Sequence, residues 1–216
     1  MKERMVRYNF LVEKLPDMVD ISGRKYEIRS DFRVGFKLEE IMRNPNLTDE
    51  MKILDMLNEY YPVIPMNLKG AIEKALWFYR CGNEKSEQKE KKGRYRNRNR
   101  KQEIAYSFCQ DAPYLYAAFL EQYGIDLCEV KYMHWWKFCS MFESLNEETQ
   151  MSKIMYYRQV STIGMPKEKR MYITEMKNKY RLDDLTSTEN KVSLAQRNAD
   201  WREYIKNRYR GLSEVK

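Results

Sequence analysis

The sequence lacks the residue patterns on which most enzymes and metalloproteins depend. It contains a single histidine, His134, so a site with several imidazole ligands or a serine–histidine relay has at most one base available. Its eight glycines form neither G-x-G-x-x-G nor G-x-x-x-x-G-K-[ST], which excludes the common glycine-rich cradles for nucleotide phosphates. The hydrolase motifs H-E-x-x-H and G-x-S-x-G are absent as well. We therefore expect a protein that is not an enzyme and that has no metal or other cofactor.

Cysteine is sparse, and long apolar runs are missing. The four cysteines include no C-x-x-C pair, which argues against a zinc knuckle or a thioredoxin-type motif and favours buried free thiols. No apolar run approaches the roughly 18 residues needed to span a bilayer. The N-terminal sequence MKERMVRYNFLVEKLP has no continuous apolar region of the kind found in secretory signals. The sequence thus predicts a protein of a reducing cytoplasm that makes no membrane contact.

Positive charge is concentrated in one segment. The 216 residues carry a net charge of +8, of which residues 84–103 contribute +5, from nine Lys or Arg against four Glu. That segment has one aromatic and no aliphatic residue, so it cannot bury enough surface to offset the entropy lost on ordering. A flexible basic linker over residues 83–103 is therefore predicted. Its RYRNRNRK core also resembles an arginine-rich nucleic-acid arm, although the interrupting glutamates favour a solvated connection. The candidate contacts of this alternative are Arg94, Arg96, Arg98 and Arg100.

The linker divides the chain into two helical units. Residues 1–82 form the N-terminal unit, residues 104–182 an aromatic C-terminal unit, and residues 183–216 a polar, basic tail. Within the first unit, apolar residues alternate on both sides of a Ser-Gly turn, which predicts a β-hairpin over residues 18–29. Two strands alone are marginally stable. We therefore expect a mainly α fold in which this hairpin packs on a multi-helix bundle.

Three helices are predicted in the N-terminal unit from capping and stop signals. The first begins after Ser30 or Asp31 and ends at an Asn-Pro pair. The second begins after Thr48, and the third spans about residues 67–80 and stops at Gly82. The inward-facing side chains of the second and third helices are expected to be Ile53, Leu54, Leu57, Tyr60, Tyr61, Ile72, Ala75, Leu76 and Tyr79.

Four helices are predicted in the C-terminal unit. Asp111 is expected to cap the first, which ends at Gly124, and further helices are placed near residues 148–160 and 166–180. The second helix of the unit, which lies between Gly124 and residue 148, has a polar face that includes His134. The apolar stripes expected on the first two helices are Ala112, Leu115, Tyr116, Phe119, Leu120 and Tyr123, and then Trp135, Phe138, Cys139, Phe142 and Leu145.

Three features of this unit could indicate a site. As a catalytic base, His134 would need a nucleophile and an orienting carboxylate, but its helical neighbours Lys137 and Phe138 supply neither. A histidine at the rim of a tryptophan-rich core is therefore favoured. The adjacent tryptophans are expected to pack in that core rather than to form a ligand cage. Arg158 lies near the apolar face of its helix, and Asp126 is its expected partner in a structural clamp.

Several segments together resemble the siphophage gene-product-fifteen family. They are DAPYLYAAFLEQYGIDL, the HWWKF box, IMYYR and the opening LPDMVDISGRKYEIRSDFR, and the resemblance covers roughly residues 10 to 182. The family occurs in temperate phages of Gram-positive bacteria. Its genes typically lie between those of the tail tube protein and the tape measure protein, where tail assembly chaperones are encoded. The resemblance therefore implies a phage tail morphogenesis protein in the cytoplasm of the bacterial host, with no catalytic residues to transfer.

This resemblance implies a tail assembly chaperone that binds the tape measure protein, the tail tube protein or both. The 14 methionines suit adaptable apolar surfaces, and several copies on one long client would make a homo-oligomer compatible with the role. In the tail, Trp201, Tyr204 and Ile205 are candidate docking residues. The alternative function is a virion or assembly component that contacts nucleic acid through the basic linker.

Overall fold

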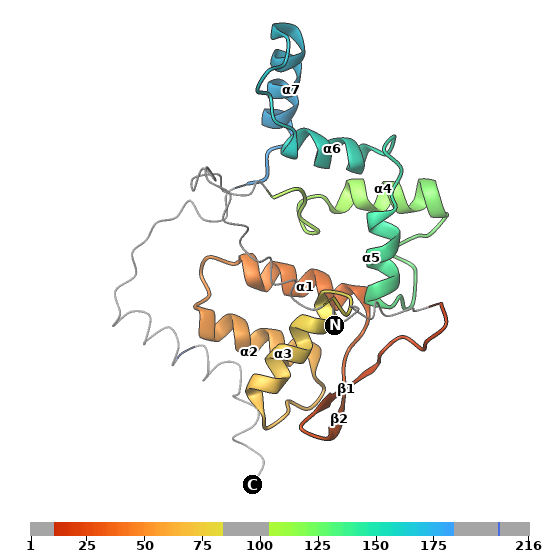
Figure 1. Ribbon diagram of the computed structural model, residues 1–216, viewed down its shortest axis with the longest axis vertical. Coiled ribbons are helices and arrows are strands. Elements are labelled where there is room, and N and C mark those ends of the chain that lie inside the picture. Colours follow the sequence, from red (N-terminus) through yellow and green to blue (C-terminus); the bar gives the residue numbers. More distant parts are fainter. Residues whose placement is uncertain (1–10, 84–103, 184–202, 204–216) are drawn as a thin grey trace, which may run out of the picture.

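The computed structural model describes residues 11–83, residues 104–183 and Glu203, and these residues form a mainly α fold (Figure 1). An antiparallel hairpin of strands β1 (Met18–Ile21) and β2 (Arg24–Glu27) precedes seven helices in these ranges. The helices are α1 (Phe32–Arg43), α2 (Asp49–Tyr60), α3 (Leu68–Tyr79), α4 (Ala112–Tyr123), α5 (Trp135–Glu143), α6 (Gln150–Gln159) and α7 (Lys167–Lys179). The predicted fold class is confirmed. None of the described helices combines the length and apolar character needed to cross a membrane.

The hairpin forms at the position that the alternation of apolar residues predicted. Val19 pairs with Tyr26, and the turn residues Ser22 and Gly23 adopt φ values of +55° and +79°. Both values lie in the left-handed region, which matches the twist of a tight hairpin turn. The buried side chain of Ile21 faces α3, where a Cβ on Gly70 would lie 2.9 Å from it. The hairpin is therefore supported by a helix, as two isolated strands require.

Side-chain caps set the start of each N-terminal helix. Asp31 accepts a hydrogen bond from the backbone N–H of Arg33, and Thr48 accepts one from Met51. These bonds satisfy amide groups that have no partner within the first helical turn. Of the two alternatives Ser30 and Asp31, the cap of α1 is Asp31, and α2 begins after Thr48 as predicted. The prediction that Ile53 points inward is wrong, because its side chain is 40% exposed and the buried face of α2 is turned toward α1 and α3.

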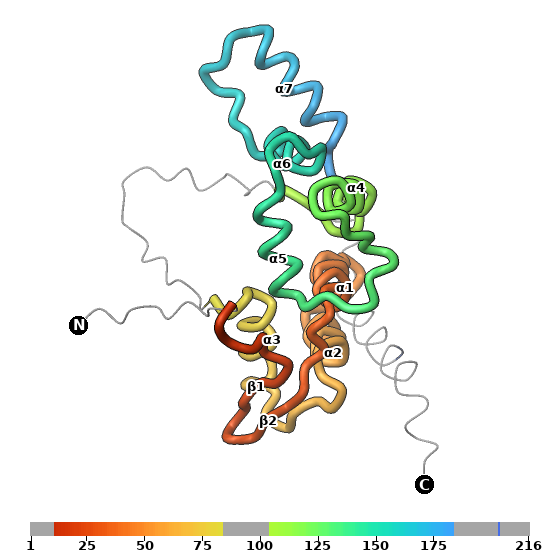
Figure 2. The backbone as a smooth tube through the Cα atoms, turned by 90° about the vertical axis from the view of Figure 1, so that its right-hand side faces the viewer, coloured from red at the N-terminus to blue at the C-terminus, as the bar shows by residue number. Residues whose placement is uncertain are grey.

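One aromatic core joins the two parts of the described chain. The Phe138 ring of α5 lies at its centre, stacked on Phe32 from α1 with ring centroids 5.3 Å apart and on Phe119 from α4 at 5.1 Å. Its ring also stacks on Trp135 at 5.6 Å. In Figure 2, α5 runs from the level of α1 up to α4 and α6. Helix α5 therefore connects the hairpin and α1–α3 to α4 and α6.

Helix α4 uses a narrower buried face than its sequence predicted. Its buried residues are Leu115, Ala118 and Phe119, whereas Ala112 and Leu120 are exposed, contrary to the expected stripe. The reason is that α4 packs on α6 as well as on the aromatic core, which turns the buried face toward the Ala118 side. Gly124 ends the helix at φ +64°, as predicted for a left-handed stop.

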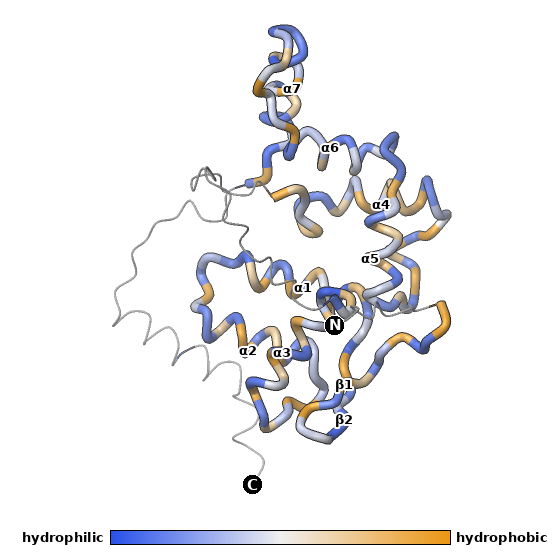
Figure 3. Tube along the Cα trace, in the orientation of Figure 1, coloured by the Kyte–Doolittle hydropathy of each residue, from blue (hydrophilic) through white to orange (hydrophobic). Residues whose placement is uncertain are grey.

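Helices α6 and α7 form a hairpin at one end of the molecule. Helix α7 packs mainly on α6 and lies at the far end of the longest axis in Figure 1. Only Ile173 among its residues is buried. Along this helix, hydrophilic residues alternate with isolated hydrophobic ones (Figure 3). The start at Pro166 and the basic last turn with Lys177 and Lys179 agree with the sequence-based prediction.

Candidate functional site

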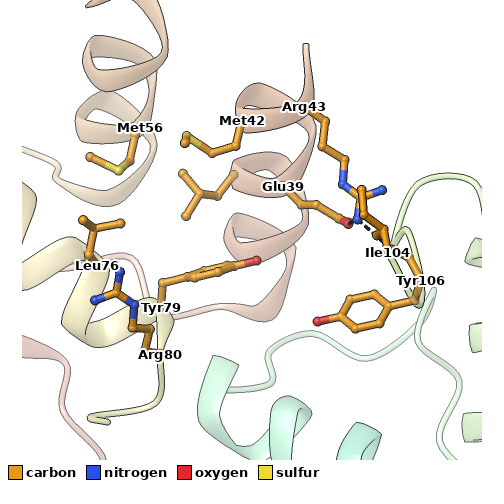
Figure 4. Close-up of a pocket in the computed structure, with 10 residues that line it drawn as sticks. Glu39, Met42, Arg43, Met56, Leu76, Tyr79, Arg80, Ile104 and Tyr106 are labelled. Carbon is orange, nitrogen blue, oxygen red and sulfur yellow. Dashed lines mark hydrogen bonds and ion pairs between the residues drawn. The ribbon is translucent and has the colours of Figure 1, made fainter. Parts of the chain in front are cut away.

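A cavity of about 440 Å³ lies between α1, α2, α3 and residues 104–106 (Figure 4). Its size falls in the range of about 300–1,000 Å³ that is common for binding pockets. Met42 is 50% exposed and Ile104 is 56% exposed, so both lie where the cavity meets solvent. The side chains that line the cavity are Leu38, Glu39, Met42, Arg43, Met56, Leu76, Tyr79, Arg80, Ile104 and Tyr106.

An ion pair forms the polar wall of this cavity. Glu39 Oε1 lies 2.6 Å from Arg43 Nη2, one turn further along α1, and Glu39 Oε2 accepts the backbone N–H of Phe108 at 2.7 Å. Arg43 also donates to the carbonyl of Tyr106 at 2.7 Å. Burial raises the pKa of Glu39, and the Phe108 amide and Arg43 oppose that rise. The pair therefore fastens the segment before α4 to α1.

The remaining cavity groups are suited to apolar binding. Burial raises the pKa of Tyr79 and of Tyr106, so both phenols are neutral at physiological pH. Met42 and Met56 contribute flexible thioethers that adapt to irregular shapes. Across the described ranges, no group of three His, Cys, Asp or Glu side chains is placed to hold a metal ion. The arrangement can bind an apolar side chain next to the guanidinium groups of its two arginines.

His134 is buried at the start of α5. Its Nδ1 accepts the backbone N–H of Trp136 at 3.1 Å, so its Nε2 carries the proton and donates to the Pro16 carbonyl at 3.1 Å. Burial lowers the pKa of His134, and protonation of Nδ1 would remove this cap. The predicted packing against the tryptophans is confirmed, with the ring edge-on to Trp136. The predicted position on a polar helix face is wrong, because His134 precedes the helix and caps it.

The adjacent tryptophans act as anchors of the core. Their indole N–H groups donate to backbone carbonyls at the end of α3: Trp135 to Tyr79 at 2.9 Å and Trp136 to Phe78 at 2.8 Å. A Cβ on Gly35 of α1 would lie only 2.4 Å from the Trp135 ring. The two tryptophans therefore pack the start of α5 against α1 and α3, and the predicted packing role is confirmed.

Arg158 forms a buried clamp with Asp111. Its Nη1 donates to Asp111 Oδ2 at 2.6 Å and its Nη2 to Oδ1 at 2.8 Å, and the two side chains are 8% and 2% exposed. The guanidinium also donates to the carbonyls of Ala105 and Tyr180, at 3.0 and 2.7 Å. The clamp therefore joins α6 to the start of α4 and to the segments on either side of the C-terminal helices.

Two predictions about these carboxylates are wrong. Asp126 is not the partner of Arg158, because it accepts the backbone N–H of Cys128 at 2.8 Å and the Tyr116 hydroxyl at 3.1 Å. Asp111 occupies the capping position of α4 but makes no capping hydrogen bond with its side chain. Its oxygens are engaged by Arg158 and by the backbone N–H of Ser107.

All four cysteines are free thiols, as expected, but they differ in exposure. Cys109 and Cys128 are exposed, contrary to the expected burial, and Cys81 and Cys139 are half-buried. A hydrogen bond with Cys81, together with burial, holds the pKa of the Cys139 thiol well above its usual value. This thiol is therefore neutral at physiological pH.

The other predicted site residues lie outside the described residues. They are Arg94, Arg96, Arg98, Arg100, Trp201, Tyr204 and Ile205. The cavity residues, in turn, were not singled out from the sequence. Their only signal was a set of apolar side chains on three helices, which is also what an ordinary core contains.

Comparison with protein families matches residues 11–182 to the family described as Bacteriophage Gp15 protein. The match covers the hairpin, the cavity and the clamp of Arg158. No curated protein and no solved structure matches the chain.

Proposed function

The chain belongs to the bacteriophage Gp15 protein family and is a phage structural or morphogenesis protein, and from this we propose that it acts as a non-catalytic tail assembly chaperone. Its clients are the tape measure protein, the tail tube protein or both. It works in the cytoplasm of the bacterial host while the tail is being built. The role requires surfaces that shelter apolar side chains, and it requires no chemical step.

The observation that carries this proposal is the methionine-containing cavity. A helical client presents apolar side chains in rows spaced three and four residues apart, and grooves that bind such helices take these side chains as anchors. Met42 and Met56 can adjust to anchors of different shape, which suits a client with many similar segments. Arg80 would pair with an acidic residue beside the anchor, whereas Arg43 is already paired with Glu39.

Co-expression with the tape measure protein tests the proposal. The wild-type chain should raise the soluble fraction of that protein and co-purify with it. Met42→Glu places a carboxylate at the cavity mouth and should abolish both effects. Met66→Glu makes the same change at a methionine that is 94% exposed and does not line the cavity, so it should behave as wild type.

The outcomes separate the role from the site. If the wild-type chain neither solubilises nor co-purifies with the tape measure or tail tube protein, the chaperone role fails. If the wild type succeeds and Met42→Glu performs equally well, the cavity is not the client site. Circular dichroism on both variants shows whether they retain the fold.

The candidate docking residues of the tail are tested in the same assay. Deletion of residues 187–216 removes Trp201, Tyr204 and Ile205 and should weaken co-purification if they bind the client. A triple alanine variant of these residues is the matched comparison, because it keeps the length and charge of the tail. Unchanged capture by both variants would leave the cavity as the client site.

A second candidate function is supported by the net charge of +5 over residues 84–103. A virion or assembly component could contact nucleic acid through Arg94, Arg96, Arg98 and Arg100. Filter binding across salt concentrations tests this, because phosphate contacts make log affinity fall linearly with log salt. Replacing the four arginines by glutamine should reduce that slope by roughly 3–4 on duplex DNA. Absence of salt-dependent retention for both RNA and DNA would eliminate this candidate.

A further inference from the structure

The charge of the described chain is segregated. Residues 167–181, which comprise α7 and its C-terminal end, carry six Lys or Arg against two Glu, a net charge of +4. Residues 11–83 carry eleven basic and twelve acidic residues, and residues 104–166 carry four and seven. Outside α7 and its end, the described chain is therefore acidic. Opposite charges on two parts of one molecule favour contact between copies.

Helix α7 and the loop before it also expose apolar side chains. Ile163 is 77% exposed, Met171 is 62% exposed and Tyr172 is 50% exposed. We call residues 161–181 the basic arm. Isolated helices as short as α7 are marginal in water, and α7 buries only Ile173. Tyrosine and methionine are enriched at the centre of protein interfaces, and the surrounding rim is polar, so Met171 and Tyr172 on a charged helix fit a docking element.

An acidic surface of matching character lies where α4 ends. Glu121 on α4 and Glu143 and Glu147 around the α5–α6 connection are exposed, and Leu120 beside them is 43% exposed. The Gln122 side chain holds these segments together, since it donates to Ser144 O at 3.0 Å and accepts from Asn146 N at 2.7 Å. These four residues, Leu120, Glu121, Glu143 and Glu147, are called the acidic patch.

We propose that the basic arm of one copy docks on the acidic patch of a second copy of this chain. Each copy presents both surfaces, the arm beyond α6 and the patch at the end of α4 (Figure 1). Such a contact joins two different surfaces, so it is head-to-tail and can repeat from copy to copy. Lysine and arginine meet glutamate across it, while Met171 and Tyr172 meet Leu120. The contact needs no client and does not depend on the chaperone role.

Sedimentation velocity of the full chain, over a range of protein and salt concentrations, tests the contact. The wild type should self-associate, and the association should weaken as salt screens the charges. Lys167→Glu/Lys169→Glu/Arg170→Glu changes the net charge of residues 167–181 from +4 to −2, and Glu143→Lys/Glu147→Lys changes that of the acidic patch from −3 to +1. Each reversal should weaken self-association by about tenfold or more. Glu27→Lys/Glu73→Lys makes the same charge change at exposed glutamates elsewhere and should retain the association.

Mixing the two reversed variants gives the decisive result. The arm of each then meets a patch of opposite charge on the other, so association should return in the mixture and be absent from either variant alone. A fold defect cannot produce this recovery. A wild type that stays monomeric at all concentrations overturns the proposal, and so does a mixture that remains dissociated. Because no tape measure protein is present, these outcomes are independent of the chaperone assay.

Discussion

Removing Arg158 should destabilise the protein more than any surface substitution. Arg158→Met keeps an apolar side chain of similar length and deletes the guanidinium. It leaves the Asp111 carboxylate, which is 2% exposed, with the backbone N–H of Ser107 as its remaining hydrogen-bond donor among the described residues. The carbonyls of Ala105 and Tyr180 lose a donor at the same time. An ionised group is then buried without compensation, which is the costly case.

The magnitude follows from breaking one side of a buried ion pair. Such changes cost about 3–5 kcal/mol, a large share of the total stability of about 5–15 kcal/mol typical of a folded protein. For a chain of this size, each kcal/mol corresponds to roughly 2–4 °C in Tm, so a decrease of about 6–20 °C is expected. Asp111→Asn removes the opposite charge and should also be destabilising, because the guanidinium then stays buried without a counter-ion.

Urea unfolding of the wild type, both single variants and Arg158→Met/Asp111→Asn measures the coupling. The double variant buries no charge at this point, so its loss should be smaller than the sum of the single losses by about 1–3 kcal/mol. Lys153→Met removes one side of an exposed pair with Glu148 and should cost no more than about 0.5 kcal/mol. A loss below about 1 kcal/mol for Arg158→Met, or strict additivity in the cycle, would refute the reasoning.

Three further predictions concern single buried groups. Gly35→Ala should cost about 1–3 kcal/mol in urea unfolding, because its Cβ would lie 2.4 Å from the Trp135 ring; unchanged stability would show that the ring can move. Burial raises the pKa of Glu39, so its contribution to stability is present below the unfolded pKa and is lost as pH rises through the folded pKa. Relative to Glu39→Gln, the wild type should therefore weaken with rising pH in this window, and parallel pH profiles would contradict the assignment. Burial lowers the pKa of His134, so stability should fall as pH drops below its ordinary value of 6.5. His134→Asn, which keeps a capping acceptor, should remove that fall; as His134 is the chain's only histidine, a persisting fall would assign it to other groups.

Local signals in the sequence were sufficient for the secondary structure. The hairpin turn depends on Gly23, and the starts of α1 and α2 depend on Asp31 and Thr48, whose side chains act on amides two or three residues away. Interactions over so short a distance are encoded in the neighbouring sequence and need no knowledge of the fold.

The partners of buried polar groups could not be read in the same way. Asp111 and Asp126 are both carboxylates near the ends of α4, and their choice of partner depends on where α6 crosses α4. Asp126 accepts hydrogen bonds from nearby backbone amides, and Arg158 pairs with Asp111 instead. The cavity posed the same difficulty, because it lies between helices from one unit and a segment from the other. Tertiary packing decides these arrangements, and it cannot be predicted from the local sequence pattern.

The shared aromatic core has a consequence for synthesis on the ribosome. Phe32 of α1 stacks on Phe138 of α5, and Trp135 and Trp136 bond to the end of α3. At roughly 5–20 residues per second, α5 leaves the ribosome roughly 5–20 s after α1. Through that interval the nascent N-terminal helices expose the rings that α5 later covers. A protein proposed to shelter the apolar surface of another therefore passes through a stage in which its own apolar surface is exposed.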